Sequence, residues 1–151
     1  MAEDLRSILP DQRLRVGSHI KVPRSGYDHH GIYVGRYQVI HFSGKSTSLI
    51  DKSQGRIGLT SLRKFALETK IEMVEYKPLP PIFSREDIVA RAEERLEKAR
   101  ANDDDDKYNL FFNNCEHFAT CCVTGQAKSE QIRTVVLGGL AGLLFYRMVD
   151  L

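Results

Sequence analysis

The stretch HHGIYVGRYQVIHFS, residues 29–43, has the pattern of a β-hairpin. Its two runs of β-branched and aromatic residues meet at Gly35 and Arg36, and such runs around a short glycine-bearing turn are typical of paired antiparallel strands. A histidine stands toward the outer end of each run, His29 in the first and His41 in the second. Because a hairpin brings the outer ends of its strands together, we expect His29 and His41 to lie side by side.

The segments around this hairpin have the mixed pattern of an α+β domain. We expect a strand at 17–22, a polar loop at 43–58, a short helix at 60–67 that Thr60 or Ser61 caps, and a strand at 70–77. Further on, Ser84 and Asp87 form a capping box that predicts the start of a longer amphipathic helix. The fold class expected from these elements is α+β, with a small antiparallel sheet packed on helices.

The composition is that of an ordinary globular domain. The chain has 151 residues, of which 42% are hydrophobic and 28% charged, so one domain with a sizeable core is expected. A formal net charge of +2 gives no reason to expect nucleic acid as a partner. The three cysteines include no CxxC pair, and the charged N-terminus lacks the apolar core of a secretory signal. We therefore expect free thiols and a cytoplasmic protein.

A second informative stretch is NNCEHF, residues 113–118. Asn114 is a good N-cap for a helix that runs from Cys115 to about Val123 and that Gly125 closes. Unpaired N–H groups and the helix dipole favour an anion at a helix N-terminus, so we expect a lowered pKa and a thiolate at Cys115. The same N–H groups are suited to bind the oxyanion that forms when a thiolate attacks a carbonyl group.

A nucleophilic cysteine needs a base, and the base needs a group that fixes its orientation. His29 and His41 are the candidates for these two roles, because the hairpin brings them together. His117 lies two residues beyond Cys115, where side chains on a helix point apart. We expect His30 to be a partly exposed strand residue without a catalytic role.

Each of these residues has a plainer explanation when it is taken alone. A single cysteine is commonly a small buried hydrophobe, and we expect Cys121 and Cys122 to be core or surface thiols. A strand histidine such as His19 has no obvious role. A zinc site is a further alternative, but the paired ligand spacings of zinc motifs are absent, so we expect no metal and no cofactor. The combination of one cysteine with two histidines is what favours catalysis.

The C-terminal run TVVLGGLAGLLFY, residues 134–146, is uncharged and lies between Arg133 and Arg147. It is shorter than the ~20 apolar residues that a membrane span needs. A buried core helix is one interpretation, and a membrane-facing anchor is the other, because the glycines of this run permit close helix packing in lipid. We place a catalytic domain at 1–128 and an apolar C-terminal helix, the candidate anchor, at 129–151.

Taken in this order, HHGIYVG, VIHFSG and NNCEHF resemble the lecithin retinol acyltransferase-like proteins. The resemblance extends over most of the chain. It implies a permuted papain-like, NlpC-type fold, in which the histidines precede the cysteine. It also implies that Cys115 is the nucleophile, that His29, rather than His30, is the general base, and that His41 orients this base.

The resemblance also implies a reaction. Members of this family take an acyl chain from a phospholipid as a thioester and pass it to water, an amine, a lysophospholipid or retinol. We therefore expect a thiol-dependent acyltransferase or phospholipase A that acts on phospholipids at a membrane surface. Retinol is not an expected acceptor, because the long insertion of the retinol-specific members is not evident. The alternatives are a cysteine amidase or peptidase of the NlpC type and a non-catalytic binding or regulatory module.

Overall fold

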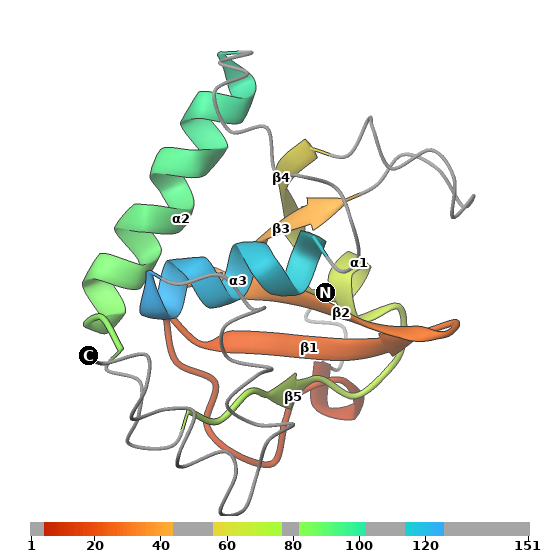
Figure 1. Cartoon of the computed structure of the whole chain (residues 1–151). Coiled ribbons are helices and arrows are strands. Elements are labelled where there is room, and N and C mark those ends of the chain that lie inside the picture. Colours follow the sequence, from red (N-terminus) through yellow and green to blue (C-terminus); the bar gives the residue numbers. More distant parts are fainter. Residues whose placement is uncertain (1–4, 44–55, 77–81, 102–113, 126–151) are drawn as a thin grey trace, which may run out of the picture.

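One antiparallel sheet is the centre of the computed structural model, which describes residues 5–43, 56–76, 82–101 and 114–125 (Figure 1). The strands described are β1 (His19–Arg24), β2 (Tyr27–Gly35), β3 (Gln38–Ser43), β4 (Arg56–Ser61) and β5 (Glu72–Met73), in the order β4-β3-β2-β1-β5. The helices described are the 3₁₀ turn η1 (Leu5–Ser7), α1 (Leu62–Ala66), α2 (Arg85–Arg100) and α3 (Asn114–Thr124). The α+β class with a small antiparallel sheet is confirmed, whereas the permuted papain-like assignment stays a prediction.

The hairpin at residues 29–43 is confirmed. β2 and β3 pair in an antiparallel register in which Gly31 lies opposite His41 and Tyr33 lies opposite Val39. The turn residues Arg36 and Tyr37 both have positive φ angles, 52° and 56°, which match the right-handed twist of paired strands in a two-residue hairpin turn.

Helices cover both faces of the sheet (Figure 1). Helices α2 and α3 lie on the first face, where the buried residues are Ile32, Ile40, Phe42, Ile57, Ile88, Ala92, Leu96, Cys115, Phe118, Ala119, Cys122 and Val123. The short helix α1 lies on the second face, where the buried residues are Ile8, Ile20, Val22, Tyr33, Val39, Leu62, Phe65, Ala66 and Ile71. Alternate residues of β2 therefore face different helices, and this alternation decides which side of the sheet each histidine occupies.

The two longer helices begin and end close to where the sequence predicts. The Ser84 side chain accepts a hydrogen bond from the Asp87 backbone N–H at 3.1 Å, so the predicted cap of α2 is confirmed. Helix α3 runs over Asn114–Thr124, and the Gly125 N–H bonds to the Cys121 carbonyl at 2.9 Å with a positive φ of 77°. Gly125 thus closes α3 as predicted.

Two sequence expectations about the strands are wrong. The expected loop at 43–58 ends too late, because Arg56–Ser61 forms β4, which pairs with β3 at the edge of the sheet. Ser61 then caps a helix that is shorter than expected, through a 3.2 Å bond from the Lys64 N–H. The expected strand at 70–77 contracts to Glu72–Met73, which pairs with Lys21 and Ile20 of β1.

The predicted C-terminal helix at 129–151 lies outside the described residues. Among the helices that are described, none has the length and apolar character that crossing a membrane requires.

Candidate active site

The two histidines predicted as base and orienting group are in contact. His29 Nε2 lies 2.8 Å from His41 Nδ1, and the two rings meet edge to face with their centroids 5.0 Å apart. His29 lies near the start of β2, and His41 lies on the neighbouring strand opposite Gly31. The hairpin register therefore places the pair diagonally across two strands, within reach of each other's rings.

Both rings rest on Phe65 of α1, on the second face of the sheet. The ring centroid of Phe65 lies 5.2 Å from that of His29 and 5.8 Å from that of His41. Gly31 makes this contact possible, because a Cβ atom at that position would lie 2.6 Å from Val39 Cγ1 and 3.0 Å from Phe65 Cε2. The glycine between the two histidine positions thus lets Phe65 pack under both rings.

Burial keeps both imidazoles neutral. Desolvation lowers the pKa of His29 to about 3, with smaller contributions from the nearby His41 and Arg24. The pKa of His41 is lowered to about 4, again by burial first and by Arg24 second. A neutral imidazole has one nitrogen that accepts a proton, so at neutral pH His29 is in the form that a general base requires.

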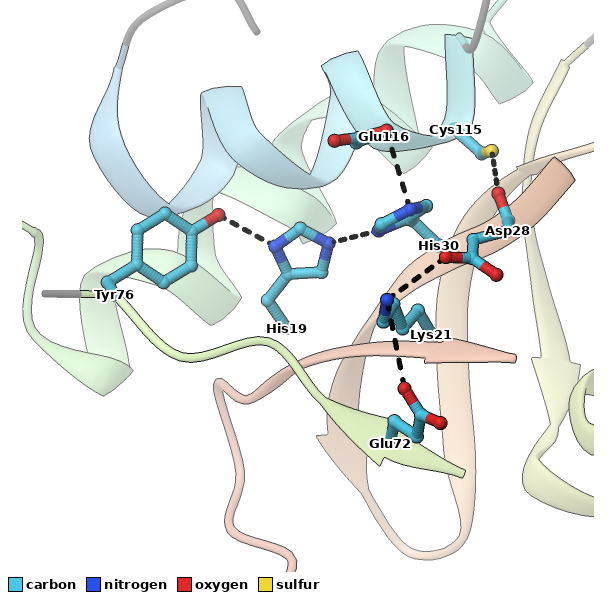
Figure 2. Close-up of polar contacts among 8 residues, drawn as sticks. All are labelled: His19, Lys21, Asp28, His30, Glu72, Tyr76, Cys115 and Glu116. Carbon is cyan, nitrogen blue, oxygen red and sulfur yellow. Dashed lines mark hydrogen bonds and ion pairs between the residues drawn. The ribbon is translucent and has the colours of Figure 1, made fainter. Parts of the chain in front are cut away.

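Cys115 reaches the same part of β2 from the other face of the sheet. Its side chain is 5% exposed, and its Sγ atom lies 3.7 Å from the Asp28 carbonyl oxygen (Figure 2). The pairing of β2 with β3 stops at Gly31 and His41 as far as the described strands run. The backbone groups of Asp28 and His30 therefore lie outside the pairing with β3, where the thiol can reach them.

The carboxylate of Asp28 is held away from this contact. Lys21 Nζ lies 3.0 Å from Asp28 Oδ2 and 3.7 Å from Glu72 Oε2, so a lysine on β1 bridges acids on β2 and β5 (Figure 2). Only the backbone carbonyl of Asp28 meets the thiol. These exposed ion pairs contribute little stability, but they fix the direction of the Asp28 side chain.

The expectation of a lowered thiol pKa is wrong for this arrangement. Burial raises the pKa of Cys115, and hydrogen bonds from the backbone N–H groups of His30 and Glu116 offset that effect only in part. Desolvation of the sulfur therefore outweighs the helix N-terminus. The thiol is protonated at neutral pH, so an attack by Cys115 requires a base to remove its proton during the reaction.

The structure brings the histidines together but gives the thiol a different partner. Among the described residues, no hydrogen bond joins the Cys115 thiol to the His29 ring, because the thiol donates to the Asp28 carbonyl. The His29 side chain lies on the Phe65 face of the sheet, whereas Cys115 packs in the cluster under α2 and α3. Both groups nevertheless lie at the same few residues of β2.

Arg24, at the end of β1, is a site residue that the sequence reasoning missed. Its Nη2 atom lies 2.5 Å from the Phe65 carbonyl oxygen, and its charge acts on His29, His41 and Cys115 together. The sequence signal that was available is a single arginine five residues before His29. Its position at the hairpin end of β1 becomes informative only when β1 is paired with β2.

The expectation that His30 is partly exposed is wrong. His30 is 5% exposed and its Nδ1 atom lies 2.8 Å from Nε2 of His19, which is 4% exposed (Figure 2). Alternation along β2 explains this, since His30 faces the helices while His29 faces Phe65. His19, a strand residue for which the sequence indicates no role, is the partner of His30 in this contact.

The remaining predicted residues have ordinary positions. Cys121 and Cys122 are buried, so they belong to the core, and burial raises the pKa of Cys122 to about 12. His117 is half-buried on α3, and burial and then Arg95 lower its pKa. Within the described part of the chain, no group of three metal-ligating side chains is arranged to hold a metal ion.

The α+β fold gathers a cysteine and a histidine pair around one stretch of β2, which makes this stretch a candidate active site. A profile of the family described as lecithin retinol acyltransferase matches residues 12–128. The chain belongs to this family.

Individual relatives agree with this assignment. The chain is 31% identical to phospholipase A and acyltransferase 2 of Homo sapiens over 87% of this chain and 85% of the relative. It is 29% identical to phospholipase A and acyltransferase 1 of Homo sapiens, over 80% of this chain and 73% of the relative. Lecithin retinol acyltransferase of Bos taurus is 26% identical over 76% of this chain and 56% of the relative.

Proposed function

We propose that the protein is a phospholipid acyltransferase or phospholipase A in which Cys115 carries the acyl group as a thioester. Its relatives are named phospholipase A and acyltransferase, or lecithin retinol acyltransferase, and these activities at family level make an enzyme of the same class the first choice. The observation that carries the proposal is the 2.8 Å contact between His29 and His41 beside the strand backbone that Cys115 touches.

One arrangement of protons fits both the histidine contact and the proposed reaction. If His29 donates its Nε2–H to His41 Nδ1, the remaining nitrogen, His29 Nδ1, is free to accept a proton. His29 Nδ1 takes the Cys115 proton as Sγ attacks the ester carbonyl carbon of a phospholipid. His41 then holds the imidazolium in its orientation, which is the role of the third group in triads of this kind.

The first half-reaction ends in a thioester. The tetrahedral intermediate carries its negative charge on the former carbonyl oxygen, and backbone N–H groups at the start of α3 are suited to bind it. Collapse of the intermediate breaks the ester C–O bond, and His29 returns its proton to the leaving lysophospholipid oxygen. Cys115 is left as an acyl thioester, with atoms and charge balanced.

The second half-reaction repeats the same proton transfers. An acceptor hydroxyl, amine or water attacks the thioester carbonyl carbon while His29 Nδ1 takes its proton. The C–S bond then breaks, and the sulfur recovers a proton from His29. Water as acceptor gives a free fatty acid, the phospholipase outcome, and an amine or lysophospholipid gives acyl transfer.

Thiol and base must approach each other for this chemistry. The thiol is bonded to Asp28 in the structure, and catalytic hydrogen bonds often form only when a substrate is bound. Arg24 supports a shared site, because its charge acts on the thiol and on both histidines. An acyl chain that enters between the start of α3 and β2 would displace the thiol from the Asp28 carbonyl.

Mass spectrometry of the intact protein tests the proposal. After incubation with phosphatidylcholine of one defined chain length, we expect the mass to rise by one acyl group on the peptide that holds Cys115. Hydroxylamine should remove this group. The variant Cys115→Ser should show no adduct and no fatty acid release, while the control Cys122→Ser, at a buried thiol on the same helix, should keep both. Fatty acid release by Cys115→Ser at the wild-type rate would refute the proposal.

A further inference from the structure

A chain of buried and partly buried polar side chains connects α3 to the sheet on the face opposite the His29–His41 pair. The Tyr76 hydroxyl lies 2.7 Å from His19 Nδ1, and His19 Nε2 lies 2.8 Å from His30 Nδ1 (Figure 2). His30 Nε2 in turn lies 3.5 Å from Glu116 Oε2 (Figure 2). The chain therefore passes from the segment after β5, through β1 and β2, to the residue that follows Cys115.

Both ends of this polar chain meet α3. Tyr76 is hydrogen-bonded to the buried Thr120 as well as to His19. Thr120 and Glu116 are four residues apart on one helix, so they are neighbours on the same face. The four side chains from Tyr76 to Glu116 thus hold the first two turns of α3 at two points one turn apart.

The carboxylate at one end favours one direction for the hydrogen bonds. A carboxylate accepts but does not donate, so the tautomer of His30 that suits the 3.5 Å contact with Glu116 carries its proton at Nε2 and accepts at Nδ1. His19 then donates from Nε2 and accepts at Nδ1 from the Tyr76 hydroxyl. All donors point the same way, and every buried ring nitrogen of His19 and His30 has a partner.

Burial makes this arrangement sensitive to loss of one member. Desolvation lowers the pKa of His19 far below its usual value and raises that of Tyr76, so both side chains are neutral. Removal of one partner leaves a buried polar atom unpaired, which costs about 1–3 kcal/mol. We expect the first turn of α3 to move in response, because Glu116 on this turn is partly exposed at the end of the polar chain.

We propose that Tyr76, His19, His30 and Glu116 are positioning residues that hold the first turn of α3, and with it Cys115, against β2. The inference rests on the proposed function in one respect, since it takes the position of Cys115 to matter for turnover. None of the four residues accepts or donates a proton in the reaction, and their effect reaches the thiol through the backbone of residues 115 and 116.

A pair of variants at His30 separates positioning from simple stability. His30→Gln keeps an acceptor oxygen toward His19 and an N–H donor toward Glu116, whereas His30→Leu keeps neither. With a short-chain phosphatidylcholine, we expect His30→Leu to lower kcat by about 10²-fold, the effect of a displacement of about 1 Å, with KM little changed. His30→Gln should restore most of kcat. A folded His30→Leu with wild-type kcat, or a His30→Gln that is equally impaired, would overturn the inference.

Site-resolved labelling with iodoacetamide tests the inference without a phospholipid. Cys115 is only 5% exposed in the wild type. If His30→Leu releases the first turn of α3, Cys115 should be labelled faster in this variant than in the wild type. Equal labelling of Cys115 in the two proteins would overturn the inference. A wild-type protein that turned over no phospholipid would refute the proposed function alone, and the labelling test would still apply. If His30→Leu does not fold, Tyr76→Phe decides, with a lower kcat expected and an unchanged kcat contradicting the inference.

Discussion

His29 Nε2 lies 2.8 Å from His41 Nδ1, and the two residues are 12 positions apart on adjacent strands. The contact depends on the two-residue turn at Arg36 and Tyr37, because a turn of another length would change the register of β2 and β3. A shift by one residue would move His41 to the α3 face and separate it from His29. The turn, together with the register shift between Tyr33 and Gly35, thus fixes the geometry of the proposed base.

The first prediction concerns the different roles of the two histidines. His29→Ala removes the proposed base and should lower kcat by about 10²–10⁴-fold. His41→Gln keeps a polar group beside His29 Nε2 and should lower kcat less, since the orienting group acts only through tautomer and position. Steady-state turnover of a short-chain phosphatidylcholine measures both. A larger loss of kcat in His41→Gln than in His29→Ala would show that His29 is not the base.

The second prediction concerns the protonation of the cysteines. Burial raises the pKa of Cys115 and raises that of Cys122 further, to about 12. In the native protein, Cys115 should therefore become reactive toward iodoacetamide at a higher pH than it does in the urea-unfolded chain, and Cys122 at a still higher pH. Site-resolved labelling across a pH series gives the midpoints. A native Cys115 midpoint below the unfolded one would show that the helix N-terminus outweighs desolvation.

The third prediction concerns Arg24. Its positive charge lowers the pKa values of His29 and His41, so Arg24→Met should raise both. Protonation of the base produces the acid limb of the pH profile of kcat/KM. This limb should then move to higher pH. Arg36→Met, in the exposed hairpin turn, is the matched control and should leave the limb in place. Coincident profiles for the wild type and Arg24→Met would exclude an electrostatic role for Arg24.

The fourth prediction concerns stability in acid. His29 and His41 have folded pKa values of about 3 and about 4, below the ordinary value of 6.5, so the unfolded chain binds protons that the native state excludes. The stabilisation is complete above pH 6.5 and is lost as the pH falls toward the folded values. Each histidine contributes a slope of up to about 1.4 kcal/mol per pH unit to the free energy of unfolding.

Urea unfolding at several pH values between about 7 and about 5 measures this slope. His41→Gln cannot take up the proton, so its slope should be smaller than that of the wild type by one histidine's share. An equal slope in the variant would mean that His41 titrates alike in the folded and unfolded states.

The fifth prediction concerns the glycine under the histidine pair. A Cβ atom at Gly31 would lie 2.6 Å from Val39 Cγ1 and 3.0 Å from Phe65, so Gly31→Ala should destabilise the fold by about 1–3 kcal/mol, as overpacking does. Gly58→Ala, in β4, is the control, because its new Cβ atom would meet nothing within 4 Å. Thermal unfolding compares the two. Equal melting temperatures would show that Phe65 moves aside without cost.

The features that local sequence predicts correctly are those whose partners are close in the chain. The hairpin, the histidine pair, the Ser84 cap of α2 and the glycine that closes α3 all depend on residues within about a dozen positions of one another, and all are found. The edge strand β4 was missed because Ile57 is its one buried position, so the apolar alternation that marks a strand is weak there.

The features that local sequence does not predict depend on distant partners. The proposed positioning role of His19 depends on Tyr76, which lies 57 positions away. No local sequence pattern predicts that contact. The raised thiol pKa has the same origin, because Cys115 is desolvated by its packing against the sheet and α2. Burial that depends on the tertiary fold outweighs a helix-end effect that the sequence alone displays.

The separation of Cys115 from Asp28 by 87 positions has a consequence for synthesis of the chain. The hairpin that pairs His29 with His41 is local and is complete long before Cys115 leaves the ribosome. Cys115 reaches β2 through a contact between residues that are far apart in the sequence, and such contacts form slowly. A nascent chain therefore holds its histidine pair before it holds Cys115, and the three side chains of the proposed site come together only after α3 has been synthesised.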